Sequence, residues 1–171
     1  ELRERGVKFN GKIALGSMVE LPSTVEIIEE LLEEVDFISV GTNDLIQYTL
    51  AVDRSNARVA SLYEPLHLAV IRLINYVIDT GKKFNVPVAL CGEMGADPIC
   101  TVLLVGLGLR EISLTPSTIP EIKKIIRSSS YQAAKTSAQI VLQMDTVGEI
   151  KKYLFEQMRD LGMVELMELY H

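Results

Sequence analysis

The sequence predicts a parallel α/β fold, because short apolar segments alternate with longer segments in which apolar residues recur at helical spacing. Each short segment is a nearly continuous apolar run, which is typical of a strand in a parallel sheet covered by helices. Strands that alternate with helices pair in parallel through right-handed crossovers. The four predicted strands are at 13–19, 37–40, 86–90 and 111–114.

Helices are predicted after each strand and in the last part of the chain. The first begins at a capping-box spacing, Ser23 three residues before Glu26, and has apolar residues on one face opposite glutamates. Asp44 is expected to be the N-cap of the second helix, and Gly81 is expected to end the third. The helices are expected at 23–35, 45–50, 66–81, 98–106, 119–127, 131–143 and 146–161, with a tail to residue 171.

The composition predicts a globular cytoplasmic protein. Of the 171 residues 48% are hydrophobic and 23% charged, and no apolar run is long enough to cross a bilayer. The net charge of -6, without a basic cluster interleaved with aromatic residues, argues against nucleic acid as a partner. Cys91 and Cys100, without a signal peptide at the start, indicate free thiols in a reducing compartment. Because the chain begins with Glu1, we expect a piece of a longer protein.

Polar side chains that could bind a ligand or take part in a reaction follow three successive predicted strands. Glu20 follows the first, Asn43 and Asp44 follow the second, and Cys91 follows the third. In parallel α/β folds the carboxyl ends of all strands lie on one face, so these residues are expected to share one site. A carboxylate is a hard oxygen ligand for a metal, and the guanidinium of Arg54 can clamp a phosphate or carboxylate. The pattern predicts a site for a metal and a small anionic substrate.

Each of these residues also has a structural interpretation. Glu20 could pair with a lysine or cap the following helix, Asp44 could be a plain N-cap, and Asn43 could be a turn residue. Arg54 could be a surface cation. Cys91 could be a small buried apolar residue, although its neighbours Gly and Glu suit a cleft better than a core.

Other motifs carry less weight. Cys91 and Cys100 are too far apart for a CxxC pair and have no histidine near them in sequence, which argues against a zinc site. The glycines at 106 and 108 do not extend to a dinucleotide-binding GxGxxG motif. His67 lies at a predicted helix start, and His171 ends the chain, so neither is a candidate phosphocarrier.

Three longer motifs together point to a family. GTNDLIQYTLAVDR, preceded by DFISV, resembles the signature of the phosphoenolpyruvate-utilising enzymes, and ALGSMVELP and ALCGEMGAD resemble two strand-end motifs of that family. The similarity is greatest to enzyme I of the bacterial sugar phosphotransferase system, the phosphoenolpyruvate-protein phosphotransferase. AVDR and STIPEIKKIIR favour enzyme I over pyruvate phosphate dikinase and phosphoenolpyruvate synthase. The resemblance runs from about Gly11 to about Leu161.

The resemblance implies a role for each strand-end residue. Glu20 and Asp44 match the carboxylates that hold Mg²⁺, and Asn43, Asp44 and Arg54 match residues that bind phosphoenolpyruvate. Cys91 matches the proton donor. Loss of the phosphoryl group leaves the enolate of pyruvate, and a thiol that is mostly protonated at neutral pH can deliver the proton to carbon.

The resemblance also implies that the chain is one domain, residues 1–171, equivalent to the C-terminal half of a TIM (β/α)₈ barrel followed by C-terminal helices. A full barrel needs roughly 250 residues. The acceptor-histidine domain, and the domain that docks the histidine-containing phosphocarrier protein, cannot be located in this sequence. Half a barrel leaves sheet edges and an inner face uncovered, so we expect either dimerisation or a closure other than a barrel. The resemblance favours a homodimer, because the barrel domain of the family is a dimerising unit.

These observations leave three functional hypotheses open. The chain is the phosphoenolpyruvate- and Mg²⁺-binding part of a phosphotransferase that transfers a phosphoryl group to a protein histidine, releases pyruvate and stands at the head of bacterial sugar uptake. Alternatively, it is an inactive dimerisation or ligand-binding fragment. In the third hypothesis it is the same domain of a dikinase or phosphoenolpyruvate synthase. In each case we expect the isolated chain to be inactive.

Overall fold

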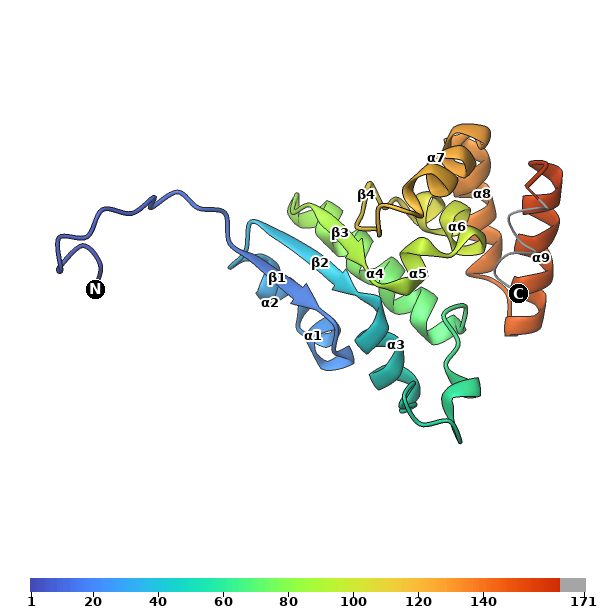
Figure 1. The fold of residues 1–171 in the computed structure, drawn as a ribbon, viewed down its shortest axis with the longest axis horizontal. Helices are drawn as coiled ribbons and strands as arrows, with labels where there is room; N and C mark the ends of the chain where they lie inside the picture. The colour runs from blue at the N-terminus through green and yellow to red at the C-terminus, as the bar shows by residue number, and fades with distance from the viewer. Residues whose placement is uncertain (164–171) are drawn as a thin grey trace.

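Four parallel strands form one sheet in the computed structural model, which describes residues 1–163 (Figure 1). The strands are β1 (Gly16–Val19), β2 (Phe37–Gly41), β3 (Val88–Cys91) and β4 (Glu111–Ile112), and each is hydrogen-bonded in parallel to the next along the chain. Parallel strands in sequential order, joined by helices, are the repeating unit of a (β/α) barrel. The predicted parallel α/β class is therefore confirmed.

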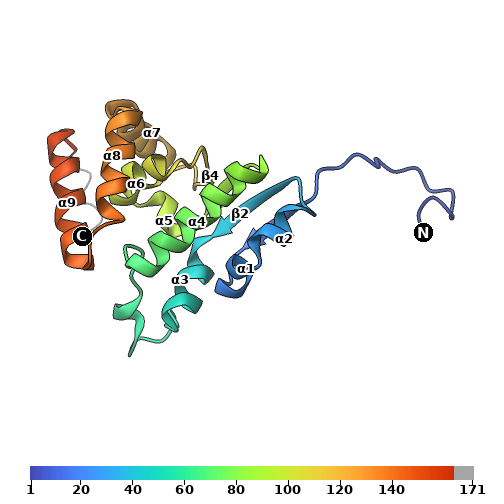
Figure 2. The same cartoon turned by 180° about the vertical axis from the view of Figure 1, so that it is seen from behind.

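The helices lie on one side of the sheet and beyond its β4 edge. α1, α2 and α4 lie over one face, whereas α6, α7, α8 and α9 are grouped beyond β4 (Figures 1 and 2). The helical elements are α1 (Pro22–Glu26), α2 (Ile28–Leu32), α3 (Thr42–Leu50), the 3₁₀ turn η1 (Ala60–Leu62), α4 (Leu68–Phe84), α5 (Glu93–Ala96), α6 (Pro98–Leu107), α7 (Ile119–Ser128), α8 (Tyr131–Val141) and α9 (Val147–Asp160). No helix in the described part of the chain is both long and apolar enough to span a membrane.

The two faces of the sheet differ, because successive side chains of a strand point to opposite sides. One face packs on the helices through fully buried aliphatic side chains of the first three strands, namely Val19, Ile38, Val40 and Leu90. The other face, called the open face below, carries Met18, Phe37, Ser39, Ala89 and Cys91. On it Met18 remains 47% exposed and Phe37 42% exposed. The main core therefore lies between the sheet and the helices.

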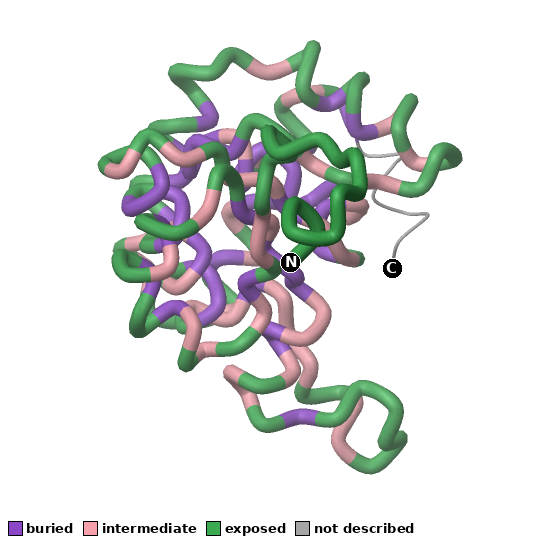
Figure 3. The backbone as a smooth tube through the Cα atoms, turned by 90° about the vertical axis from the view of Figure 1, so that its left-hand side faces the viewer, coloured by how far each residue is buried: buried purple, intermediate pink, exposed green. Residues whose placement is uncertain are grey.

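The first predicted strand was too long. Residues 1–15 are exposed and form an arm that extends away from the sheet (Figures 1 and 3). Ile13 and Leu15 are 79% and 62% exposed, and β1 begins only at Gly16. The base of the arm is fixed by Asp36, whose carboxylate accepts from the Leu15 N–H at 2.7 Å.

Three predicted helix boundaries were also wrong. The residue at the N-cap of α1 is Leu21, without a side-chain cap, so the expected capping box of Ser23 and Glu26 does not form, and the helix is interrupted at Ile27. α3 begins at Thr42, which puts Asp44 in its first turn rather than at the N-cap.

The third helix, α4, continues past Gly81 to Phe84, and Asn85 in the left-handed region forms its C-cap. Gly81 has a packing role instead: a Cβ there would overlap the side chain of Val88 on β3. The glycine thus lets the helix approach the sheet. The predicted helical tail to residue 171 lies outside the described residues.

Candidate functional site

The strand-end residues lie at the carboxyl end of the sheet, the side at which all four strands end. The arrows of β1, β2 and β3 point to this edge in Figure 1. Glu20 directly follows β1, Asn43 and Asp44 lie in the first turn of α3 after β2, and Cys91 is the last residue of β3. Burial of the apolar row beneath them fixes the register, and with it the height at which each strand ends. The structure places these residues on adjacent strands, as the sequence pattern predicted.

Gly41 makes room for the carboxylate of Glu20. A Cβ built on Gly41 would lie 2.9 Å from Glu20 Oε2 and 3.1 Å from Met18 Sδ. The Glu20 side chain therefore lies against Gly41 at the end of β2. Asp44 follows Gly41 by three residues in the sequence. A side chain at position 41 would fill the space that this carboxylate uses.

Hydrogen bonds join the end of β3, and the residues after it, to the start of α3. Thr42 Oγ1 donates to the Cys91 carbonyl at 2.9 Å, and Asn43 Oδ1 accepts from the Glu93 N–H at 2.9 Å. Gly92 between them has φ +108°, and a Cβ there would overlap Thr42 Oγ1 and approach Asn43 Oδ1 to 2.9 Å. Glycine is required at this position by both the backbone angle and the space. The Asn43 side chain is thereby fixed in orientation.

Arg54 reaches the same edge from the loop after α3. Its Nη1 is 2.8 Å from Glu93 Oε1, and the two side chains are 42% and 73% exposed. Its backbone N–H donates to Gln47 Oε1 of α3 at 3.4 Å. The loop begins at Ala51, which adopts the left-handed conformation and ends the helix. Arg54 is therefore a member of the strand-end cluster, paired with Glu93.

Tyr63 completes the cluster from the far end of this loop. Its phenolic oxygen is buried and has no hydrogen-bond partner among the described residues. The pKa of Tyr63 is raised to about 12, mainly by burial and next by the negative charge of Glu93, with a smaller rise from Asp44, while Arg54 lowers it. These three charged side chains are the ones that act on the phenol. The next residue, Glu64, forms an ion pair with Lys151 of α9 at 2.6 Å, which fastens the loop to the helices.

The thiol of Cys91 lies on the open face of the sheet. Ser39 Oγ donates to its sulfur at 3.5 Å, and the sulfur is 3.6 Å from the Val40 carbonyl and 3.7 Å from Met18 Sδ. Met18 also packs beside Gly41 and Glu20. The thiol is therefore next to the carboxylate side of the site, one layer below the cluster of Asn43, Arg54 and Glu93.

Sequence reasoning missed two members of this cluster. Glu93 was noted only as a polar neighbour of Cys91, and Tyr63 lay in a stretch without a periodic pattern. The glycine before Glu93 was a usable signal, since glycine at a strand end indicates a close approach of backbone or ligand. Nothing in the sequence distinguished Tyr63 from the other tyrosines.

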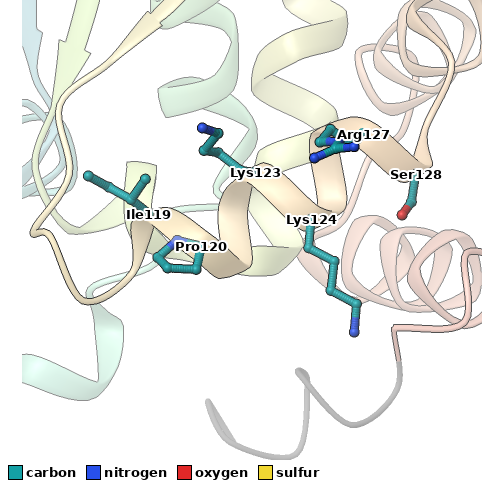
Figure 4. A pocket seen from close by; sticks show the side chains of 6 residues that line it. All are labelled: Ile119, Pro120, Lys123, Lys124, Arg127 and Ser128. Atoms are coloured by element: carbon teal, nitrogen blue, oxygen red, sulfur yellow. The ribbon is translucent and has the colours of Figure 1, made fainter.

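A hollow of about 540 Å³ opens beside the cluster. It is lined by Asn43, Gly92, Glu93, Ala96 and residues 113–116 after β4. Another hollow lies along α7 and is lined by residues of that helix alone (Figure 4). There Lys123 and Arg127 point to one side and Lys124 to the other, so their charges do not converge (Figure 4). The hollow at the strand ends is the better candidate because it joins residues from three successive strand ends.

The residues present suit Mg²⁺ better than a metal held by a protein cage. The described residues contain no cluster of three or more His, Cys, Asp or Glu side chains suited to a metal. Glu20 and Asp44 offer two carboxylates at adjacent strand ends, and Gly41 keeps the space of the first clear. Mg²⁺ is usually bound through one or two carboxylates, with substrate oxygens and water completing the octahedron. Two carboxylates at adjacent strand ends therefore fit this ion.

Comparisons with known proteins find matches over most of the chain. The family model described as PEP-utilising enzyme, PEP-binding domain, matches residues 1–131. The phosphoenolpyruvate-protein phosphotransferase of Haemophilus influenzae is 46% identical over 156 residues, which are 91% of this chain and 27% of that protein. The protein of the same name from Bacillus subtilis is 42% identical over 156 residues, again 91% of this chain and 27% of the relative. The chain thus spans about a quarter of the length of these relatives.

Proposed function

Because this chain belongs to the family of PEP-binding domains of PEP-utilising enzymes, we propose that it forms the phosphoenolpyruvate- and Mg²⁺-binding part of a phosphotransferase. In this proposal the whole enzyme moves the phosphoryl group of phosphoenolpyruvate to a protein histidine and releases pyruvate. The proposal is supported by the placement of Glu20, Asn43 and Asp44 directly after adjacent strands, and by the ion pair that brings Arg54 to Glu93 after the third strand. The names of the relatives favour this reading over a dikinase or a phosphoenolpyruvate synthase.

Substrate binding follows from the groups at this edge. Mg²⁺, when bound, neutralises phosphate charge, and Glu20 and Asp44 are the residues that would hold it. Asn43 uses its carbonyl oxygen to accept from Glu93, which leaves its NH₂ group to donate to an anionic oxygen. Arg54 contributes a planar fork that binds a carboxylate or phosphate through two parallel hydrogen bonds. The proposed ligand is thus held by charge and by directed donors.

Proton delivery is the proposed role of Cys91. Departure of the phosphoryl group leaves its bonding electrons on the enolate oxygen of pyruvate. The thiol proton then goes to the methylene carbon, which becomes the methyl group of pyruvate, and the sulfur is left as a thiolate. The Ser39 hydroxyl, which donates to this sulfur at 3.5 Å, stabilises that thiolate. The step needs no group beyond the thiol and the enolate.

The phosphoryl acceptor is proposed to lie outside this chain. His67 is at the N-cap of α4, where its Nδ1 accepts from the Ala69 N–H at 3.2 Å, so the ring serves a structural purpose. We therefore expect the isolated chain to bind ligand without turnover. The acceptor histidine, and the docking site for the histidine-containing phosphocarrier protein, would be in other domains of the enzyme. The cytoplasmic location predicted from the sequence stays a prediction.

A homodimer is proposed from the uncovered parts of the sheet. β1 and β4 are its edge strands, and Met18 and Phe37 are 47% and 42% exposed on the open face. Exposed strand edges and apolar surface favour association with another chain. Light scattering over a concentration series tests this, and a constant monomer mass would refute it.

Calorimetric titration with phosphoenolpyruvate, with and without Mg²⁺, tests the binding proposal. We expect binding that strengthens with Mg²⁺, and we expect Asp44→Asn to need more Mg²⁺ than the wild type for the same affinity. The absence of binding by the wild type would refute the proposed function. An unchanged metal dependence in Asp44→Asn would refute only the assignment of that ligand.

A further inference from the structure

We infer that Glu93 is an internal competitor for the anion site, whose carboxylate holds Arg54 and must be displaced by an anionic substrate. The inference rests on the proposed function, because it concerns the same site, and it adds a residue to which the resemblance assigned no role. Glu93 and Arg54 are separated by 39 positions in the sequence, yet Nη1 and Oε1 are 2.8 Å apart. The guanidinium that would clamp the substrate therefore already has a carboxylate partner within the chain.

The backbone of Glu93 places its carboxylate at the substrate position. Its N–H donates to Asn43 Oδ1 at 2.9 Å, and Gly92, with φ +108°, turns the chain so that Glu93 begins α5 at the end of β3. Asn43 and Arg54, two proposed substrate ligands, are thus both bound to one residue. An anion that contacts Asn43 and Arg54 together has to enter where the Glu93 side chain meets the guanidinium.

The pair is suited to exchange rather than to permanent structure. Both side chains are partly solvent-exposed, at 42% and 73%, and such pairs contribute little free energy. An Arg fork bonded to two oxygens of a substrate is stronger than its single contact with Glu93. Phosphoenolpyruvate also carries more negative charge than one carboxylate. The substrate therefore wins the exchange, and the competition lowers its affinity by only about 1.4- to 5-fold, the range that a weak surface pair supports.

Two variants separate displacement from simple charge repulsion. Glu93→Gln removes the charge and the ion pair together. Glu93→Asp keeps the charge but shortens the side chain by one methylene, which takes the carboxylate out of contact with Arg54. Glu111→Gln is the matched control, because Glu111 is an exposed glutamate at the start of β4 that does not line the hollow at the strand ends. Both positions are exposed, so the three variants are expected to fold.

The measurement is calorimetric titration of phosphoenolpyruvate with Mg²⁺, on the longest polypeptide that the gene encodes. We expect Glu93→Gln and Glu93→Asp to bind about 1.4- to 5-fold more tightly than the wild type, and Glu111→Gln to be unchanged. Weaker binding by Glu93→Gln would overturn the inference, since Glu93 would then position Arg54 for the substrate. Tighter binding by Glu93→Gln but not by Glu93→Asp would also overturn it, in favour of repulsion. If the wild type itself does not bind, the proposed function fails and the inference falls with it.

Discussion

Replacing Gly41 by alanine tests whether the Glu20 carboxylate belongs to a metal site. Gly41 has φ -83° and ψ 88°, a backbone conformation without positive φ, so alanine introduces no left-handed strain. The new methyl group would lie 2.9 Å from Glu20 Oε2, 3.0 Å from Glu20 Cβ and 3.1 Å from Met18 Sδ. These neighbours are atoms of the partly exposed Glu20 side chain and the exposed Met18 side chain, and they have to shift by a few tenths of an ångström. The carboxylate is therefore displaced while the backbone stays in place.

The expected result is a loss of metal affinity that exceeds the loss of stability. Overpacking costs about 1–3 kcal/mol in a closed core, and a site whose neighbours can move is expected near the low end. Alanine also restricts the unfolded chain, which stabilises the folded state by about 0.4–1 kcal/mol and offsets part of the cost of overpacking. The net change in the free energy of unfolding is thus within about 1 kcal/mol. Displacing a metal ligand by a neighbouring change typically costs about 10- to 100-fold in affinity.

Two assays check this prediction. Urea unfolding gives the change in stability, and titration with Mg²⁺ at a fixed phosphoenolpyruvate concentration gives the metal affinity. Gly148→Ala is the control, because the nearest atom to a Cβ there is Thr146 Oγ1 at 4.0 Å. This variant adds a methyl group to a glycine without crowding any neighbour. A Gly41→Ala variant that kept wild-type Mg²⁺ affinity would refute the placement of Glu20 as a ligand. A loss of several kcal/mol in stability would refute the picture of movable neighbours.

Three further changes test other parts of the structure. Tyr63→Phe removes a buried hydroxyl without a partner, so it should raise the free energy of unfolding by about 1 kcal/mol in chemical denaturation. Because the pKa of Tyr63 is raised to about 12, the folded protein holds the phenolic proton more tightly. Wild-type stability should therefore fall from pH about 10 to about 12, and this part of the loss should be missing in Tyr63→Phe. Gly106→Ala would push a methyl group into the backbone of Ala134 and should cost about 1–3 kcal/mol in the same assay, whereas an unchanged midpoint would contradict the close α6–α8 contact. In the intact enzyme Cys91→Ala should slow pyruvate formation far more than it weakens phosphoenolpyruvate binding, and equal losses would count against a proton donor.

The fold class could be predicted from the sequence because the buried, helix-covered face of the sheet requires runs of apolar residues. Val19, Ile38, Val40 and Leu90 lie in nearly continuous apolar runs, and each run contains most or all of a strand. Boundaries were less predictable, since they depend on contacts between distant segments. Gly81 resembled a helix end, but its missing side chain accommodates Val88 of the next strand instead.

The site was predictable one residue at a time but not as a set of contacts. Spacing after the strands identified Glu20, Asn43 and Asp44, because each strand end is visible in the sequence. The ion pair of Arg54 and Glu93 joins a loop to the start of another helix, and no local pattern records which cation reaches which carboxylate. Their roles as ligands stay predictions.

The two layers of the site divide binding from protonation. Asn43 and Arg54 lie at the strand ends with Glu93, while the Cys91 thiol lies below them on the open face, with Ser39 and Met18. In the proposed reaction Asn43 and Arg54 would hold the ligand at the strand ends, and the Cys91 thiol would deliver the proton from the open face of the sheet. An enolate that also met water from that side could take its proton without the thiol. Since Met18 is 47% exposed in this chain, specific proton transfer by Cys91 requires that another part of the enzyme cover the open face.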